Sequence, residues 1–365
     1  MKHIMLIFGT RPEAIKMCPL VAALRARGAC RVTVTVTAQH RELLDRVLSV
    51  FSVMPDYDLN LMQPNQDLGS LTARALVGVG AVLDEARPDL VLVHGDTTTA
   101  FASALAAFYR GIPVGHVEAG LRTYDVRHPF PEEWNRCAVS LVAHYHFAPT
   151  EQARNRLLRE GVAASRIFVT GNTGIDSLRT TVRGEYSHES LAWAADSRLL
   201  LLTLHRRESL GAPMRGMLRA IRRALEETPD VKLIWPLHPN PLVRQIAQEI
   251  LGDSSRVRLI EPLDAPDFHN FMARSHLILT DSGGIQEEAP ALGRPVLVLR
   301  DTTERPEGVA AGGVRILGTS EESVYNGLCE LLGDSVVYAA MARVRHPYGD
   351  GHACKRIADI LFGGF

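Results

Sequence analysis

Three carboxylates in the first half of the chain, Asp96, Glu118 and Glu132, have the residue type that proton transfer requires. Acids that lie close together can hold one proton above its ordinary pKa, which general acid–base work near neutral pH needs. Each acid also has a structural interpretation. Asp96 could cap a helix that begins at Thr97, and Glu132 follows Pro131 in a first helical turn, where acids favour the helix dipole. Both interpretations stay open.

A glycine-rich segment, residues 281–284 (DSGG), follows an apolar strand and opens a helix. Glycines allow a ligand to approach the backbone closely, and the N–H groups at the start of a helix suit a phosphate. Glu288, one turn further on, could accept hydrogen bonds from ribose hydroxyls. The segment is neither a P-loop nor a G-x-G-x-x-G pattern, and neither pattern occurs in the chain, which disfavours a P-loop ATPase or a standard NAD enzyme.

A second strand-to-helix turn, residues 9–16, carries Arg11 and Lys16. Two cations near a helix N-terminus are electrostatically unfavourable unless an anion meets them. His205 follows the apolar run 199–204 directly, as a buried histidine or as one that faces a ligand. The chain contains no HExxH, no GxSxG and no His/Cys ladder at metal-ligand spacing, so metal hydrolase and serine esterase chemistry are weakly supported and no metal is predicted.

Short apolar runs alternate with helical patterns of roughly 10–20 residues, and polar motifs stand at their ends. We predict strands at 3–8, 31–37, 90–93, 113–117, 146–148 and 167–170, and again at 199–204, 232–236, 257–260, 277–280, 296–299 and 314–317. Continuous apolar strands separated by helices indicate parallel sheets that are covered on both faces. We therefore predict an α/β protein with two doubly wound domains joined near 170–195, with ligands at the carboxyl ends of the strands.

Charge and cysteine content narrow the class of protein further. The 365 residues carry 40 basic and 41 acidic side chains, a net charge of −1, which argues against a nucleic-acid partner. No apolar run reaches the ~18 residues of a membrane span, and the first apolar stretch is too short for a signal peptide, so a cytoplasmic protein without a membrane partner is predicted. Five scattered cysteines without a CxxC predict reduced thiols rather than disulfides or structural zinc.

Ten blocks of this sequence resemble the bacterial non-hydrolysing UDP-N-acetylglucosamine 2-epimerases. The blocks are FGTRPEAIKM (8–17), TAQHRELLD (37–45), LVHGDTTTAFASALAAFY (92–109), PVGHVEAGLRT (113–123), PFPEEWNR (129–136), TGNT (170–173), HRRES (205–209), LTDSGGIQEEAPALGRPVL (279–297), RDTTERPEG (300–308) and HPYGDGHACKRI (346–357). The resemblance implies a GT-B-like fold in which two Rossmann-like domains face a central cleft. The predicted domains are 1–170, with a C-terminal helix at about 346–365 that crosses back, and 171–345, which would bind UDP.

The resemblance also implies roles for individual residues. The catalytic carboxylates would be Asp96, Glu118 and Glu132, and His205 would lie near the diphosphate and aid its departure. The substrate and UDP contacts would come from Arg11, Lys16, Phe268, Ser282, Gly283, Gly284, Glu288 and Arg305. Phe268 would flank the uracil. Leu263 stands at a position where relatives often have a polar residue. A second UDP-N-acetylglucosamine could bind as an activator near Gln39 and Arg74, although Glu42 replaces a glutamine found in some relatives.

The implied reaction is reversible C2 epimerisation of UDP-N-acetylglucosamine to UDP-N-acetylmannosamine. UDP would leave by anti-elimination to give a 2-acetamidoglucal and would then re-add, which needs no cofactor. The resemblance further implies a homodimer that supplies N-acetylmannosamine units for bacterial surface polysaccharide. The alternatives are a 2-epimerase of a modified UDP-N-acetylhexosamine (a uronate or a diacetamido sugar), a GT-B glycosyltransferase and a non-catalytic UDP-sugar sensor. A sensor predicts loss of the acids, which are all present.

Overall fold

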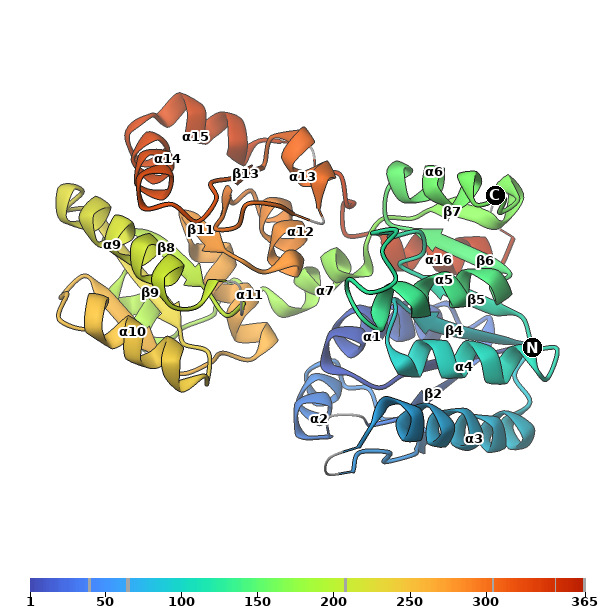
Figure 1. Cartoon of the computed structure of the whole chain (residues 1–365). Coiled ribbons are helices and arrows are strands. Elements are labelled where there is room, and N and C mark those ends of the chain that lie inside the picture. The colour runs from blue at the N-terminus through green and yellow to red at the C-terminus, as the bar shows by residue number, and fades with distance from the viewer. Residues whose placement is uncertain (39–40, 64–65, 207–208, 304, 345, 364–365) are drawn as a thin grey trace. The chain divides into compact units, whose positions relative to one another are not determined.

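The computed structural model describes residues 1–38, 41–63, 66–206, 209–303, 305–344 and 346–363. Backbone contacts divide the chain into two compact parts (Figure 1). The first unit comprises Met1–Thr180 and Tyr348–Phe365, and the second unit comprises Thr181–Pro347. The predicted domain boundaries, 1–170 with a helix near 346–365 and 171–345, stay a prediction.

The first unit is built on a parallel sheet of seven strands in the order β3-β2-β1-β4-β5-β6-β7. The strands are β1 (Lys2–Phe8), β2 (Cys30–Val36), β3 (Tyr57–Asp58), β4 (Leu90–His94), β5 (Val114–Val117), β6 (Tyr145–Ala148) and β7 (Ile167–Val169). The order reverses between β1 and β4, because β2 and β3 lie on one side of β1 and the later strands on the other. Such a switch point is where doubly wound sheets bind ligands.

Successive side chains of β1 pack alternately into two separate apolar cores, one on each face of this sheet. Leu6 and Phe8 join the apolar cluster that includes α1 (Arg11–Arg27), α2 (Arg41–Val50) and α16 (Ala353–Leu361). Met5 and Ile7 join the cluster that includes α3 (Leu68–Ala86), α4 (Thr98–Phe108) and α5 (Glu132–Val142). The remaining helices of this unit are α6 (Glu151–Arg159), the 3-10 turn Ala164–Arg166 and α7 (Thr173–Thr181), which leads into the second unit. A strand that is apolar on both faces therefore explains the continuous run at 3–8.

The helix α16 belongs to the first unit although it follows the second unit in the sequence (Figure 1). It packs against α1, and Cys354, Ile357 and Leu361 lie in the same buried cluster as β1. Asp176 of α7 accepts hydrogen bonds from the backbone N–H groups of Ala353 (3.0 Å) and Cys354 (2.8 Å) at the start of α16. The chain therefore returns to the first unit through a buried contact.

The second unit repeats the plan with a parallel sheet of six strands in the order β10-β9-β8-β11-β12-β13. Its strands are β8 (Arg198–Thr203), β9 (Val231–Pro236), β10 (Val257–Ile260), β11 (Leu277–Thr280), β12 (Val296–Val298) and β13 (Val314–Ile316). Its helices are α8 (Glu189–Trp193), α9 (Ala212–Glu227), α10 (Pro241–Leu251), α11 (Ala265–Arg274), α12 (Gly283–Ala291), α13 (Pro306–Ala311), α14 (Glu321–Gly333) and α15 (Ser335–Ala342). The order reverses between β8 and β11, which places a second switch point beside His205 and residues 281–284.

The predicted fold class, two doubly wound Rossmann-like units, is confirmed, and each of the twelve predicted strands is present within one residue at either end. Strand β3 was not predicted, because its two residues, the half-buried Tyr57 and the exposed Asp58, give no apolar run. Within the described ranges, no helix is both long enough and apolar enough to cross a membrane.

Candidate active site

The buried acid Glu13, which was not predicted as a site residue, holds the loop between β1 and α1 in place. The carboxylate of Glu13 accepts hydrogen bonds from the backbone N–H groups of Gly9 (3.1 Å) and Thr10 (2.8 Å) and from the hydroxyl of Thr97 (2.8 Å). Burial raises the pKa of Glu13, while the bonds from Thr97 and Thr10 act in the opposite direction. A Cβ atom at Gly9 would lie 1.9 Å from the hydroxyl oxygen of Thr37, so only glycine fits there. Glu13 thus ties the loop that carries Arg11 to the segment that carries Asp96.

Glu118 stands directly after β5 in a left-handed backbone conformation with φ +65°. That conformation costs an ordinary residue roughly 1–2 kcal/mol, so other contacts must stabilise it. Its Oε2 atom forms an ion pair with Lys16 and accepts a hydrogen bond from the side-chain amide of Asn172 (3.1 Å). Nε2 of His94 lies 3.7 Å from the same oxygen, and burial lowers the pKa of His94 to about 4. At neutral pH the groups near Glu118 therefore include a cation, an amide and a neutral imidazole.

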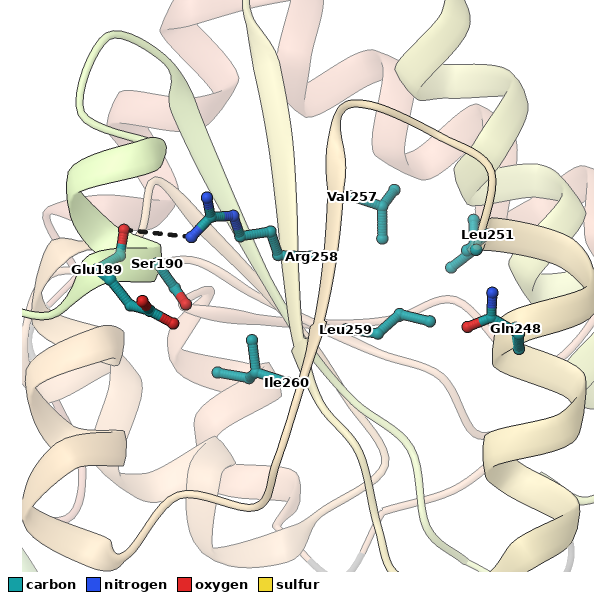
Figure 2. Close-up of a pocket in the computed structure, with 9 residues that line it drawn as sticks. Glu189, Ser190, Gln248, Leu251, Val257, Arg258, Leu259 and Ile260 are labelled. Atoms are coloured by element: carbon teal, nitrogen blue, oxygen red, sulfur yellow. Dashed lines mark hydrogen bonds between the residues drawn. The ribbon is translucent and has the colours of Figure 1, made fainter.

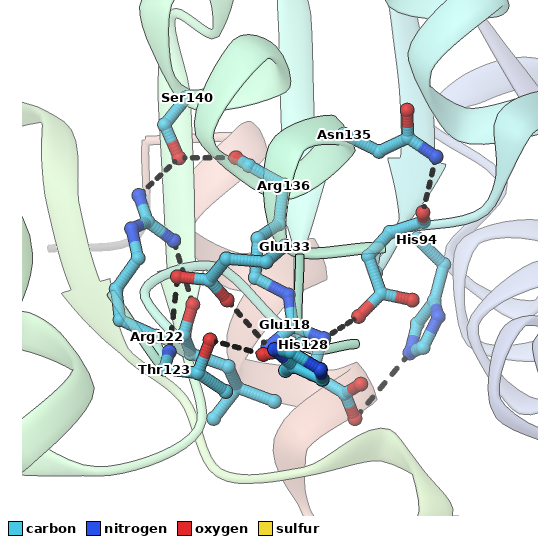
Figure 3. Close-up of polar contacts among 12 residues, drawn as sticks. His94, Glu118, Arg122, Thr123, His128, Glu133, Asn135, Arg136 and Ser140 are labelled. Carbon is cyan, nitrogen blue, oxygen red and sulfur yellow. Dashed lines mark hydrogen bonds and ion pairs between the residues drawn. The ribbon is translucent and has the colours of Figure 1, made fainter. Parts of the chain in front are cut away.

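Asp96 follows β4 and pairs with Arg136 of α5. Nη1 of Arg136 also lies 3.2 Å from Oε2 of Glu133, so one guanidinium joins two acids (Figure 3). The side-chain amide of Asn135 donates to the backbone carbonyl of Asp96 (2.9 Å), which fixes the loop. Burial raises the pKa of Asp96 and Arg136 opposes that rise, so Asp96 holds a proton more readily than a free aspartate.

Glu132 and Glu133 begin α5 and have different surroundings. Oε2 of Glu132 is buried and has no hydrogen-bond partner among the described residues, which is costly unless a ligand supplies one. Glu133 is 1% exposed and accepts hydrogen bonds from the backbone N–H groups of Thr123 and Tyr124, both at 2.9 Å. Glu132 thus keeps capacity for a ligand, whereas Glu133 holds the segment before the helix in place.

In the second unit, His205 and Asp281 lie side by side after β8 and β11. Nδ1 of His205 is 3.0 Å from Oδ1 of Asp281, and Oδ2 of Asp281 accepts the backbone N–H groups of His205 and Arg206, both at 2.8 Å. Burial works to raise the pKa of Asp281, but its contacts with His205 and these N–H groups outweigh it and lower the pKa. Since Nδ1 faces Asp281, the Nε2 edge of the ring is turned away from it.

The glycine segment opens α12, with Ser282 as the residue before the helix. A Cβ atom at Gly284 would meet nothing within 4 Å, so the backbone at this helix start is accessible. Arg305 pairs with the buried Glu287 and lies 3.9 Å from the Cβ position of Gly283. Oε2 of Glu288 lies 3.6 Å from Nε2 of His269. His269 belongs to α11, the helix that also carries Phe268. A helix start with an accessible backbone and a nearby arginine suits a phosphate group.

The structure thus brings predicted residues together in two places, one in each unit. The first unit gathers Lys16, Asp96 and Glu118, and the second gathers Arg305 with Ser282–Gly284. Arg11 is the first residue of α1, beside the loop that Glu13 holds. Arg74 of α3 donates to the side chain of Gln66 (2.6 Å) and to the carbonyl of Leu61 (3.4 Å). Gln39 lies outside the described residues.

Several residues that contact the predicted site residues were not predicted. In the first unit Arg136 pairs with Asp96 and also with Glu133, and Asn172 donates to Glu118. In the second unit Asp281 is the partner of His205. A surface hollow of about 460 Å³ along the edge strand β10 contains none of the predicted site residues (Figure 2). Among the described residues, no group of three or more His, Cys, Asp or Glu side chains could hold a metal ion.

Comparison with known proteins gives one consistent result. The family described as UDP-N-acetylglucosamine 2-epimerase matches residues 22–362. A Bacillus subtilis UDP-N-acetylglucosamine 2-epimerase is 56% identical over 358 residues, which cover 98% of this chain and 94% of that protein. The S. aureus protein MnaA, solved with UDP, is 51% identical with a TM-score of 0.89 over 100% of this chain and 97% of that chain. The Neisseria meningitidis UDP-GlcNAc 2-epimerase, solved with UDP-GlcNAc, is 45% identical with a TM-score of 0.89 over 99% of this chain and 100% of that chain.

Proposed function

The chain belongs to the UDP-N-acetylglucosamine 2-epimerase family, and from this premise we propose that it interconverts UDP-N-acetylglucosamine and UDP-N-acetylmannosamine by elimination and re-addition of UDP. The observation that carries the proposal is that the two units present different sets of polar groups. The first unit concentrates carboxylates with differing surroundings, which suits proton transfer, and the second presents a helix start beside an arginine, which suits a diphosphate.

The elimination step moves a proton and an electron pair in opposite directions. A carboxylate removes the C2 proton, the C1–C2 double bond forms, and the C1–oxygen bond breaks with its electron pair leaving on UDP. The product is a 2-acetamidoglucal. Re-addition reverses these events, with a proton delivered to the opposite face of C2. Two faces require two proton-handling groups, and Asp96, Glu118 and Glu132 are the candidates.

The environments of the three acids fit these tasks. Burial makes Asp96 hold a proton more readily, which suits an acid, whereas Glu118 forms an ion pair with the Lys16 ammonium, which suits a base. The unpartnered Oε2 of Glu132 can contact the sugar ring or share a proton. The C2 proton has no carbonyl beside it and is only weakly acidic, so departure of a stabilised diphosphate must help to drive its removal.

Stabilisation of the departing UDP is proposed for residues of the second unit, with Arg11 and Lys16 of α1 as further substrate contacts. The N–H groups at the start of α12, Arg305 and, in the protonated imidazole, Nε2 of His205 would donate to the diphosphate as negative charge develops on it. Arg11 and Lys16 would add positive charge near the same group. Phe268 and Glu288 are proposed to contact the uracil and the ribose.

The broader setting is proposed from the family resemblance. We place the enzyme in the cytoplasm as a homodimer that supplies N-acetylmannosamine units for surface polysaccharide, without a cofactor and without a nucleic-acid or membrane partner. A second UDP-N-acetylglucosamine is proposed as an activator near Gln39 and Arg74.

Proton NMR of UDP-N-acetylglucosamine in D₂O with the purified protein, without added metal or NAD, tests the proposal. The expected result is UDP-N-acetylmannosamine with deuterium at C2. A folded protein that binds UDP but gives neither a new sugar nor exchange, with substrate present in excess as its own activator, contradicts it. The same experiment with the corresponding uronate or diacetamido sugar separates the alternative substrates.

A further inference from the structure

We propose that Asn172 is a positioning residue for the carboxylate of Glu118, an assignment that rests on the proposed epimerase function. Asn172 is 3% exposed and lies between β7 and α7. Its Nδ2 atom donates to Oε2 of Glu118 at 3.1 Å, across 54 positions of the sequence. The amide therefore touches the acid and acts on the substrate only through it.

The orientation of this amide is determined by both of its neighbours. Oδ1 of Asn172 accepts the backbone N–H of Gly174 at 2.8 Å, whereas Nδ2 faces a carboxylate oxygen. An N–H can only donate and a carboxylate only accepts, so the reverse orientation would lose both hydrogen bonds. Asn172 thus has one side chain with two tasks, closing the start of α7 and holding Glu118.

The backbone of Asn172 is itself fixed by the segment that returns from the second unit. Its N–H donates to the carbonyl of Tyr348 at 2.7 Å, and Tyr348 is 1% exposed. A Cβ atom at Gly171 would lie 3.2 Å from that carbonyl oxygen and 3.3 Å from Cα of Gly349, so the two backbone segments are in direct contact. Asn172 therefore cannot shift without disturbing the return of the chain.

The contacts of Glu118 with Lys16 and with Asn172 differ in kind. The Lys16 ammonium ends a four-carbon stem and supplies charge without a fixed direction. The short side chain of Asn172, held at its oxygen and at its backbone, supplies the direction. Misplacement of a catalytic group by about 1 Å can cost about 100-fold in rate, so loss of this support is expected to lower turnover.

Asn172→Ser and Asn172→Asp test the assignment. Both side chains can still accept the N–H of Gly174, as residues before a helix do, but neither can donate to Glu118 as the amide does. We expect kcat to fall about 10- to 100-fold, with the UDP dissociation constant and KM within about twofold and the melting temperature lower by about 2–4 °C, as the loss of one hydrogen bond gives. A purely structural role predicts the same fall in melting temperature with wild-type kcat.

Asn240→Ser and Asn240→Asp are matched controls. Oδ1 of Asn240 accepts the N–H of Leu242 at 3.0 Å at the start of α10, the same i to i+2 contact, and Asn240 is half-buried. Both control variants should keep wild-type kcat.

Wild-type kcat in Asn172→Ser overturns the assignment, and so does a loss confined to Asn172→Asp, because that loss would reflect the added charge. If Asn172→Ser does not fold, wild-type kcat in Asn172→Asp overturns it alone. Absence of C2 exchange in the unmodified protein overturns the proposed function instead.

Discussion

In the first unit the polar side chains at the strand ends contact one another, whereas the second unit combines such a contact, between His205 and Asp281, with a helix start whose backbone is accessible. Glu118 contacts Lys16 and Asn172, and Asp96 contacts Arg136. Gly284, at the start of α12, has space for a side chain that is absent. The same fold thus supplies two kinds of site, one that fixes carboxylates and one that offers N–H groups. Fixed carboxylates suit proton transfer, and accessible N–H groups suit anion binding.

The largest effect is expected for Glu118→Gln, which tests the carboxylates of the first unit. Glutamine keeps the shape of the side chain but cannot take up a proton, so turnover should fall about 10²- to 10⁴-fold while UDP binding stays nearly intact. Asp96→Asn and Glu132→Gln should show the same separation. Steady-state kinetics and calorimetric titration with UDP measure the two quantities. Wild-type turnover in any one variant removes that residue from the catalytic set.

Gly284→Ala should give the converse result. The new methyl group meets nothing within 4 Å in the protein, so the fold should tolerate it, but it would lie where a phosphate approaches the helix start. We expect UDP affinity to fall about tenfold, the loss of roughly one hydrogen bond. Gly333→Ala is the matched control, because Gly333, the last residue of α14, is also a helical glycine with open space around it. Equal UDP affinity in both variants would show that the ligand does not approach Gly284.

A smaller effect is expected for Thr97→Ala in the first unit. The Thr97 hydroxyl accepts the N–H of Ala100 at the start of α4 (3.0 Å) and donates to buried Glu13 (2.8 Å), so the variant loses a helix cap and leaves a buried acid with one bond fewer. We expect the free energy of unfolding to fall by about 1–2 kcal/mol. Ser320→Ala, at the start of α14, removes only a cap and should cost less. Urea unfolding compares them, and equal losses would contradict the role given to Glu13.

The smallest effect is a difference in pH dependence between the units. The pKa of Asp281 is lowered on folding, so its contribution to stability is complete above the ordinary aspartate pKa of about 3.9 and is lost as the pH falls through the folded value. The pKa of Asp96 is raised, so its contribution decreases as the pH rises from about 3.9 through the folded value.

Urea unfolding of Asp281→Asn, Asp96→Asn and the unmodified protein from pH 3 to 7 measures both contributions. The stability difference from wild type should shrink towards acid pH for Asp281→Asn, by on the order of 1 kcal/mol. For Asp96→Asn the variant should gain relative to wild type as the pH rises. Parallel curves for the two variants would contradict the contrast between the units.

The sequence predicts the elements of this protein better than the contacts between them. The strands were predictable because each is a continuous apolar run between polar ends, and Asp96, Glu118 and residues 281–284 stand at such ends. The two-residue strand β3 lacks that signal. Which groups hold the acids could not be derived in the same way, because Arg136 lies 40 positions from Asp96 and Asn172 lies 54 positions from Glu118. Such pairings depend on how the helices pack over the sheet, and no local pattern encodes that packing.

The return of the chain to the first unit has a consequence for protein synthesis. Domains generally fold as units in the order in which they leave the ribosome. Here residues 348–361, which carry the Tyr348 carbonyl and α16, are translated after the whole of the second unit. The ribosome therefore begins the first unit first and completes it last, so a nascent chain that already contains Glu118 and Asn172 still lacks the segment that fixes them. If Glu118 acts as proposed, the catalytic geometry is therefore completed only at the end of synthesis.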